Sequence, residues 1–145
     1  MFYDQSGNEL KKFNTSDSAG VLFCHKLKIP VGIITGENTK IVEARAKKLS
    51  VDYLFQGISN KKEVAIKLCS KLNISLKDVA YIGDDIGDIK LLRSVGFSAA
   101  PNNAPDYIKK ECHYITQKKG GEGAFREFIE YLLKDKLEEI LKAYK

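Results

Sequence analysis

The sequence predicts one α/β domain in which helices cover both faces of a parallel β-sheet. Two observations lead to this prediction. From Pro30 onward, short runs rich in β-branched and aromatic residues alternate with amphipathic stretches. The apolar residues of these short runs are continuous rather than alternating, which is typical of strands buried on both faces of a parallel sheet. The 145 residues, 43% of them hydrophobic, suffice for one packed core, and no low-complexity linker divides them.

The N-terminal part differs from this alternation. Residues 2–13 are predicted to form a hairpin of two short strands around a Ser-Gly-Asn turn. The segment TSDSAGVLFCHKLK is predicted to be a helix, with Thr15, Ser16 or Asp17 available as its N-cap.

A local apolar pattern predicts each later element. Apolar runs predict strands over 31–35, 51–55 and 79–83, and shorter ones over 97–100 and 113–116. One-sided apolar residues predict helices over 37–49 and 61–72, and further helices are expected over about 86–95 and from near Ala104. The last helix, over about 123–144, has an apolar stripe made of Phe125, Phe128, Ile129, Leu132 and Leu133.

Composition and charge exclude several classes of protein. No apolar stretch approaches the ~20 residues of a membrane span, and there is no basic-then-apolar leader, so we expect a cytoplasmic protein without a membrane partner. The net charge is +5, but paired lysines are spread along helix faces without interleaved aromatic residues, so no nucleic acid partner is expected. The three cysteines match neither a disulfide framework nor a metal motif, and Cys24 and Cys69 are expected to be buried thiols.

Polar residues follow three of the predicted strands. Thr35-Gly36 comes after VGII, Lys61 after YLFQGISN, and Asp84-Asp85 after VAYIG. Ligands of parallel α/β sheets bind beyond the carboxyl ends of the strands, so these groups are expected at one rim. A hydroxyl, an ammonium and a carboxylate pair would then lie together.

Each group has a structural alternative. Thr35-Gly36 can cap the following helix or bind phosphate with its hydroxyl and N–H groups. Lys61 can face solvent, as its neighbour Lys62 also can. Adjacent carboxylates at a sheet rim gain nothing structurally, and Mg²⁺ is their usual partner. Asp88 lies one turn after Asp85 and can cap or support the pair. Together the groups indicate phosphoryl chemistry, with the nucleophile missing.

The residues also carry a family resemblance. The order of IITGE, Lys61 and YIGDDIGD resembles motifs II, III and IV of the haloacid dehalogenase-like (HAD) phosphohydrolases. Segments such as AAPNNAPDYIK and KKGGEGAFREFIEYLL resemble its small capless branch, the 3-deoxy-octulosonate 8-phosphate phosphatase type, whereas NTSDSAG, TGE and VDYLFQG look closer to ketodeoxynononate 9-phosphate phosphatases. The resemblance covers Met1 to about Leu133. It implies a three-layer, Rossmann-like parallel sheet with a small hairpin and no cap domain.

The resemblance implies a role for each rim residue. Thr35 matches the phosphate-binding hydroxyl of motif II, and Gly36 adds a backbone donor. Lys61 matches the motif III lysine that holds nucleophile and phosphate. Asp84 matches the Mg²⁺ ligand of motif IV, and Asp85 matches the neighbour that orients metal-bound water or the lysine.

The resemblance also implies a substrate and an assembly. Glu37, Arg45 and Lys48 lie where the family places substrate-selecting side chains, and Arg126 lies beside a glycine-rich loop near the substrate entrance. The implied function is a Mg²⁺-dependent phosphatase for a 2-keto-3-deoxy sugar-acid phosphate, either ketodeoxynononate 9-phosphate or 3-deoxy-octulosonate 8-phosphate. The implied assembly is a homotetramer, in which the hairpin and the glycine-rich loop reach a neighbour.

The sequence departs from the family at one motif. Family members begin with a strand ending in D-x-D-G, whose first aspartate is the nucleophile and whose second is the general acid/base. Here Asp4 lies in the hairpin and Asp17 in a helix-cap context. Either the sequence is incomplete at its start or it is a short form without catalytic residues. The first is favoured, because loss of a central strand would leave two strand edges unpaired, at about 1–3 kcal/mol for each buried backbone group.

The departure leaves two functional hypotheses. Without the D-x-D-G strand, we expect residues 1–145 to be inactive and to bind Mg²⁺ weakly. The rival is a non-catalytic module for oligomerisation, or for regulation of a cytidylyltransferase partner. A receiver domain also combines acidic residues with threonine and lysine, but its acidic pair follows the first strand and its lysine comes last, contrary to the order here.

Overall fold

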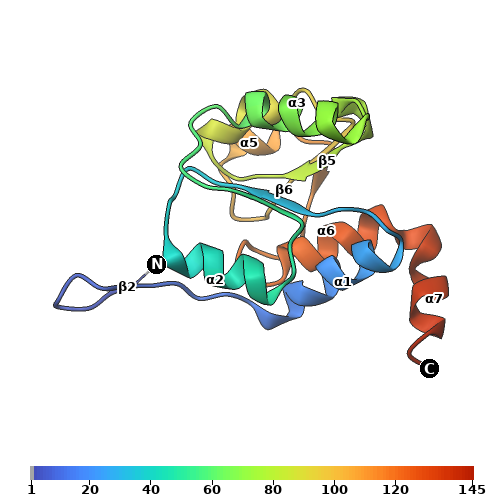
Figure 1. The fold of residues 1–145 in the computed structure, drawn as a ribbon, viewed down its shortest axis with the longest axis horizontal. Helices are drawn as coiled ribbons and strands as arrows, with labels where there is room; N and C mark the ends of the chain where they lie inside the picture. The colour runs from blue at the N-terminus through green and yellow to red at the C-terminus, as the bar shows by residue number, and fades with distance from the viewer. Residues whose placement is uncertain (1) are drawn as a thin grey trace.

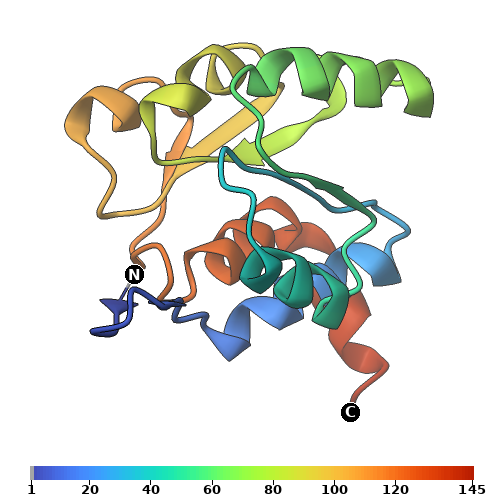
Figure 2. The ribbon, with the colours of Figure 1, turned by 60° about the vertical axis from the view of Figure 1, so that its left-hand side comes forward.

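The structure, a computed structural model that describes residues 2–145, has three layers (Figure 1). Its middle layer consists of parallel strands. One face is covered by α3 (Lys61–Leu72), α4 (Ile89–Leu92) and α5 (Asp106–Lys109), and the other by α1 (Ser18–Lys26), α2 (Lys40–Lys48) and α6 (Ala124–Leu132), as Figure 2 shows. This arrangement confirms the predicted α/β class, without a cap domain. No helix in the part that the structure describes is long and apolar enough to cross a membrane.

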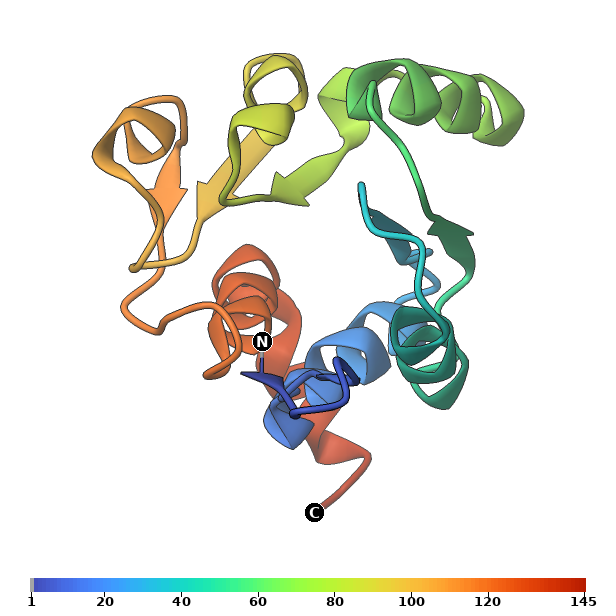
Figure 3. The same cartoon turned by 90° about the vertical axis from the view of Figure 1, so that its left-hand side faces the viewer.

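The strands were expected in one sheet, and the structure divides them into two parallel pieces. One piece pairs β3 (Gly32–Ile34) with β4 (Tyr53–Phe55), and the other has the order β5 (Ala80–Ile82), β6 (Phe97–Ala100), β7 (Tyr114–Ile115). Figure 3 shows β3 and β5 on the inner sides of the two pieces. No ladder joins them within residues 2–145. The facing edges of β3 and β5 are therefore unpaired within the described residues.

Burial along the strands agrees with this division. In β6, which has a neighbour on each side, Ser98, Ala99 and Ala100 are all 0% exposed. The residues of β5 are half-buried, and in β3 Gly32 is exposed. The edge strands and the residue before β3 nevertheless contribute to the packing on both faces of the layer. Val31, Ala80 and Ile82 contact one core cluster, and Ile34 and Tyr81 contact another.

The N-terminal hairpin projects from the body (Figure 1) and consists of β1 (Phe2–Tyr3) and β2 (Glu9–Leu10). Its turn is closed by Asp4, whose carboxylate accepts hydrogen bonds from the N–H groups of Ser6 and Asn8. Phe2, Tyr3 and Leu10 are exposed by 60% or more. Three apolar side chains on so small a hairpin leave it without a core of its own.

The helix after the hairpin begins with a 3₁₀ turn over Thr15–Asp17, so α1 itself begins at Ser18. Its capping differs from the prediction. Asn14 caps the turn by accepting from the N–H of Ser16 at 2.8 Å. The carboxylate of Asp17 instead accepts from the N–H of Arg126 in α6 at 3.1 Å. Asp17 thereby connects two helices 109 residues apart in sequence.

The prediction of a single C-terminal helix over about 123–144 is wrong. The structure has α6 up to Leu132 and a separate α7 (Lys134–Lys142), with Leu133 between them at φ −102° and ψ 16°. The break places Ile140 in the same core cluster as Leu133, with Leu137 and Leu141 packed against it. A straight helix would carry these residues away from α1, so packing outweighs the continuous helical pattern.

The remaining elements follow the prediction within a few residues. The helix predicted over 61–72 and the strand predicted over 97–100 have those bounds in the structure. Cys24 and Cys69 are buried, as expected. The helix predicted over 37–49 begins later, at Lys40, because the Thr39 hydroxyl caps it by accepting from the N–H of Val42. The helix predicted over 86–95 divides into a 3₁₀ turn (Ile86–Asp88) and α4.

Replacement of Gly96 by alanine is expected to lower the free energy of unfolding by about 3 kcal/mol. A Cβ there would overlap the backbone carbonyl oxygen of Lys77, and the Gly96 N–H is fixed by the carbonyls of Leu76 and Val79. Urea unfolding measures the change. In the control Gly32→Ala the new Cβ has ordinary contacts of 3.6 Å, so equal effects of the two substitutions would contradict this account.

Candidate active site

The predicted rim residues lie at the carboxyl ends of the strands. Thr35 and Gly36 follow β3, Lys61 is the first residue of α3, and Asp84 and Asp85 follow β5. The structure joins Lys61 to the segment after β5 by direct contact. Within residues 2–145 no hydrogen bond joins Thr35 to Lys61 or to Asp84, and Thr35 and Asp84 follow strands of different pieces of the sheet.

Asp88 is the centre of the contacts after β5. Its side chain is 2% exposed. One carboxylate oxygen, Oδ1, accepts from Lys61 Nζ and from the Tyr81 hydroxyl, each at 2.5 Å. The other, Oδ2, accepts from the N–H groups of Asp84 and Asp85, each at 3.0 Å. One buried carboxylate therefore holds both the lysine and the backbone of the acidic turn.

The hydrogen-bond donors around Asp88 and the space left by Gly83 both favour an ionised carboxylate in this position. Burial raises the pKa of Asp88, but the hydrogen bonds from Lys61, Tyr81 and the Asp85 N–H outweigh that effect and hold the pKa below its usual range. At Gly83 an added Cβ would lie 2.6 Å from Cγ of Asp88, so only glycine leaves room for the carboxylate. The GDDxxD spacing was the sequence signal for Asp88, and the structure confirms its supporting role.

The structure distinguishes Lys61 from Lys62. The Lys61 side chain is 15% exposed and paired with Asp88. Its helix begins in a fixed position, because Asn60 caps α3 by accepting from the N–H of Glu63. Lys62 lines a surface depression together with Lys61 and Lys90, and it makes no ion pair with Asp88. Of the two lysines, only Lys61 is held toward the acidic turn.

Asp84 and Asp85 have different surroundings. Partial desolvation, then the negative charges of Asp88 and Asp85, raises the pKa of Asp84, although Lys61 opposes them. Asp85 accepts from the N–H of Ile86 at 2.7 Å and so caps the 3₁₀ turn. A cation beside Asp84 would offset both the desolvation and the two neighbouring carboxylates.

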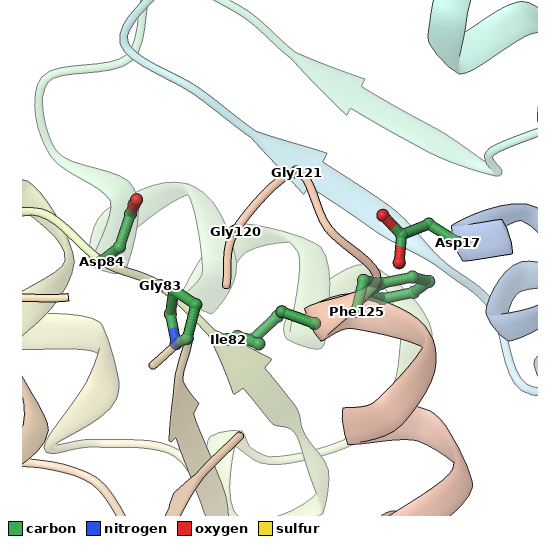
Figure 4. Close-up of a pocket in the computed structure, with 9 residues that line it drawn as sticks. Asp17, Ile82, Gly83, Asp84, Gly120, Gly121 and Phe125 are labelled. Atoms are coloured by element: carbon green, nitrogen blue, oxygen red, sulfur yellow. The ribbon is translucent and has the colours of Figure 1, made fainter. Parts of the chain in front are cut away.

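Asp84 also faces a cavity of about 180 Å³ (Figure 4). Asp17 lies on another wall, and Gly120 and Gly121 contribute a third. The apolar part of the lining comes from Ile82, Pro101, Ala124 and Phe125. The cavity therefore has two carboxylates and a backbone turn at its border.

The donor set fits a divalent cation only in part. Asp84 offers one carboxylate, which borders the cavity and accepts no hydrogen bond from another residue within residues 2–145. Asp85 and Asp88 are occupied by hydrogen bonds, and no group of three or more His, Cys, Asp or Glu side chains within residues 2–145 is arranged to hold a metal. Further oxygen ligands would have to come from water, phosphate or another segment.

Weak Mg²⁺ binding is therefore expected of the 145-residue chain, with a dissociation constant of about 1 mM or above. Isothermal calorimetry measures it, and Asp84→Asn is the control that removes the one available carboxylate. A dissociation constant in the low micromolar range, lost in Asp84→Asn, would show that this chain alone supplies a complete site.

Of the two predicted roles of Thr35 and Gly36, capping of the following helix is wrong, because α2 begins at Lys40 and is capped by Thr39. The Thr35 hydroxyl accepts from the N–H of Glu37 at 3.1 Å, which closes the turn after β3. Its own hydrogen and the N–H of Gly36 make no hydrogen bond within residues 2–145. Two donors thus remain available to an anion at the end of β3.

The expected substrate-selecting residues make contacts elsewhere. Glu37 pairs with Lys11 at the end of the hairpin. Arg45 donates to the carbonyl of Asn14 at 2.8 Å and lies over the Phe13 ring. Lys48 is exposed at the end of α2, and Arg126 pairs with Glu130 at 2.7 Å. Glu37 and Arg45 thus anchor the segment between hairpin and α1, and none of the four lines the cavity beside Asp84.

Comparison with known proteins gives the family. Residues 21–128 match the family model of the haloacid dehalogenase-like hydrolases. The chain belongs to this family. It is 39% identical over 140 residues to the 3-deoxy-D-manno-octulosonate 8-phosphate phosphatase KdsC of Yersinia pestis, covering 95% of this chain and 75% of that protein. It is 38% identical over 133 residues to KdsC of Escherichia coli K12, covering 92% of this chain and 71% of that protein.

Solved structures agree with the sequence comparison. A probable YrbI-family phosphatase of Pseudomonas syringae has a TM-score of 0.94 at 39% identity, covering 99% of this chain and 82% of that one. The 3-deoxy-D-manno-octulosonate 8-phosphate phosphatase of Moraxella catarrhalis, solved with a magnesium ion, a phosphate ion and a KDO molecule, also has a TM-score of 0.94, at 34% identity, covering 99% and 84%.

These findings confirm the resemblance and the fold it implied. They also confirm the expectation of a hydrolase of phosphoric monoesters at the level of the family. Mg²⁺, the expected cofactor, is the ion bound in the Moraxella relative.

Proposed function

We propose that the chain forms the site of a Mg²⁺-dependent phosphatase that hydrolyses a 2-keto-3-deoxy sugar-acid phosphate. The observation that carries the proposal is Asp88, which fixes Lys61 beside the Asp84–Asp85 turn. A lysine and a carboxylate turn at the carboxyl end of a parallel sheet suit a transferring phosphoryl group. The relatives at 38–39% identity are phosphatases of one such substrate.

Each residue has a role in this reaction. The Lys61 ammonium, the Thr35 hydroxyl and the Gly36 N–H bind phosphate oxygens. Asp84 contributes a ligand to Mg²⁺, which when bound neutralises negative charge on the phosphoryl group. Asp85 orients the lysine or the water around the ion. The family's D-x-D-G aspartates supply the nucleophile and the general acid/base, through an aspartyl-phosphate.

The division of the sheet into two pieces supports a position for the D-x-D-G aspartates. The facing edges of β3 and β5 have no ladder between them, and Thr35 and Asp84 follow these two strands directly. An extended segment paired in parallel with both edges would satisfy their backbone groups. Its carboxyl end would then lie between Thr35 and Asp84.

The finer features of the proposal concern assembly and selectivity. The exposed Phe2, Tyr3 and Leu10 of the hairpin support a homotetramer in which the hairpin reaches a neighbour. Selection between eight- and nine-carbon acids is assigned to Glu37, Arg45, Lys48 and Arg126. The protein is proposed to act in the cytoplasm. The alternative of a non-catalytic module has no support in the comparisons, whose named KdsC relatives are phosphatases.

The test is phosphate release by the chain extended at its N-terminus with an apolar D-x-D-G strand. Ketodeoxynononate 9-phosphate, 3-deoxy-octulosonate 8-phosphate and glucose 6-phosphate are compared, with Mg²⁺ and with a chelator. We expect one of the sugar-acid phosphates to be preferred to glucose 6-phosphate by about 10²-fold or more in kcat/KM, and the chelator to abolish release. Equal rates on all three substrates would contradict the proposed substrate class.

A further inference from the structure

The loop over 117–123 borders the cavity beside Asp84, and its conformation is fixed by several hydrogen bonds. Gly120 and Gly121 from this loop line the cavity (Figure 4). The Gly120 N–H donates to the Asn103 side chain at 2.7 Å. The carbonyl of Lys118 accepts from the Thr116 hydroxyl at 2.6 Å and from the N–H of Asn102 at 3.1 Å. These contacts attach the loop to the segment after β6.

One carboxylate holds the beginning of this loop. Glu127 in α6 accepts from the N–H of Gln117 at 2.7 Å and from the Tyr114 hydroxyl at 2.9 Å with Oε1, and from the N–H of Lys118 at 2.9 Å with Oε2. Burial raises the pKa of Glu127, but hydrogen bonds from Gln117, Lys118 and Tyr114 lower it below its usual range. All three hydrogen bonds therefore favour the ionised carboxylate.

The hydrogen bonds that Glu127 accepts require a carboxylate at this position. Both oxygens accept from backbone N–H groups, so a glutamine would present its NH₂ to one of them. Two donors would then face each other, and one N–H would lose its partner. Aspartate keeps both oxygens but is shorter by one methylene, so it cannot reach both N–H groups from the same helical position.

We infer that Glu127 is a positioning residue, which fixes the 117–123 loop and thereby the affinity of the site for the sugar-acid part of the substrate. The inference rests on the proposed function for the identity of the substrate. Glu127 itself does not line the cavity, so it acts through Gly120 and Gly121. The acidic turn on the opposite side of the cavity is held by Asp88, and the loop that contributes Gly120 and Gly121 is held at its beginning by Glu127.

The experiment compares Glu127→Gln with Glu130→Gln. Glu130 lies one turn later in α6 and pairs with Arg126 at 2.7 Å, without a hydrogen bond to the loop. Hydrogen exchange in the 145-residue chain gives the first readout. We expect the amides of Gln117 and Lys118 to exchange at least about tenfold faster in Glu127→Gln and at the parental rate in Glu130→Gln.

Steady-state kinetics of the strand-extended chain gives the second readout. We expect Glu127→Gln to raise KM for the preferred sugar-acid phosphate by about tenfold with kcat within about twofold, because ground-state and transition-state binding are weakened alike. Glu127→Asp should restore only part of the affinity.

The outcomes separate this inference from the proposed function. Equal exchange and equal KM in Glu127→Gln and Glu130→Gln would overturn the inference, as would faster exchange with unchanged KM. If no sugar-acid phosphate is hydrolysed by any form, the proposed function fails. The exchange rates, which need no catalysis, then still decide whether Glu127 fixes the loop.

Discussion

Replacement of Lys61 by glutamine is expected to lower kcat for phosphate release by about 10²–10³-fold in the strand-extended chain. Glutamine keeps the hydrogen-bonding end of the side chain but removes the positive charge that faces the phosphoryl group. Its amide would also leave the buried carboxylate of Asp88 without a counter-charge, since Lys61 Nζ is the cation that contacts it at 2.5 Å. Initial-rate measurements at saturating substrate give the change in kcat.

Lys62→Gln is the matched control for this experiment. Lys62 is the next residue of the same helix, and it makes no ion pair with Asp88, which is paired with Lys61. We expect its kcat to stay within about twofold of the parent, since a charge that is not held toward the acidic turn contributes little. If Lys62→Gln were as damaging as Lys61→Gln, the assignment of the phosphate-binding lysine would be wrong.

Replacement of Asp88 by asparagine is expected to have the largest combined effect on activity and stability. The amide would offer an NH₂ to one of four donors that now share the carboxylate, two of them backbone N–H groups of the Asp84–Asp85 turn. Loss of a partner from a buried ion pair costs about 3–5 kcal/mol. We expect the free energy of unfolding to fall by that amount, and kcat to fall by about 10²-fold as Lys61 and the turn lose their positions.

Two further variants test the role of Asp88. Tyr81→Phe removes one of the four donors and should cost only about 1 kcal/mol, since the carboxylate keeps its other partners. Glu63→Gln removes an exposed carboxylate from the first turn of the same helix as Lys61, where it pairs with Lys67. It should be close to neutral. Urea unfolding that ranks Asp88→Asn no lower than Glu63→Gln would contradict the central position of Asp88.

The sequence predicts those parts of the fold that depend on local signals. The helix over 61–72 has both its apolar face and its N-cap within the segment, since Asn60 precedes it and accepts from the N–H of Glu63. The strand over 97–100 is an apolar run after a glycine, and its bounds also agree. The carboxyl ends of the strands, and hence the rim residues Thr35, Lys61 and Asp84, follow from the order of elements.

Other features depend on contacts between distant segments. The break at Leu133 serves the packing of Ile140 on the core with Phe23 and Cys24, which no periodicity within α6 and α7 indicates. Thr15, Ser16 or Asp17 was expected to cap the first helix. Asp17 stands at the N-cap position of α1, but its carboxylate accepts from the N–H of Arg126. Local propensity describes each helix separately and therefore contains no information about this partner.

The candidate site shows the same division. Asp88 was predicted to cap or support the acidic pair because it lies three residues after Asp85, within one turn. Glu127 has no comparable signal, because its partners are N–H groups of a loop that precedes its own helix by several residues. Arg45 and Glu37 were placed by resemblance near the substrate, and the structure shows how each is bound to the segment after the hairpin.

The most direct test is the rate of Mg²⁺-dependent phosphate release from the preferred sugar-acid phosphate by the chain with and without the D-x-D-G extension. The account predicts release only from the extended chain, and its loss when both aspartates of the extension are changed to asparagine, because residues 2–145 contribute Lys61, Thr35 and Asp84 but no nucleophile between β3 and β5. Equal release from the chain without the extension, or from the asparagine form, would contradict the account.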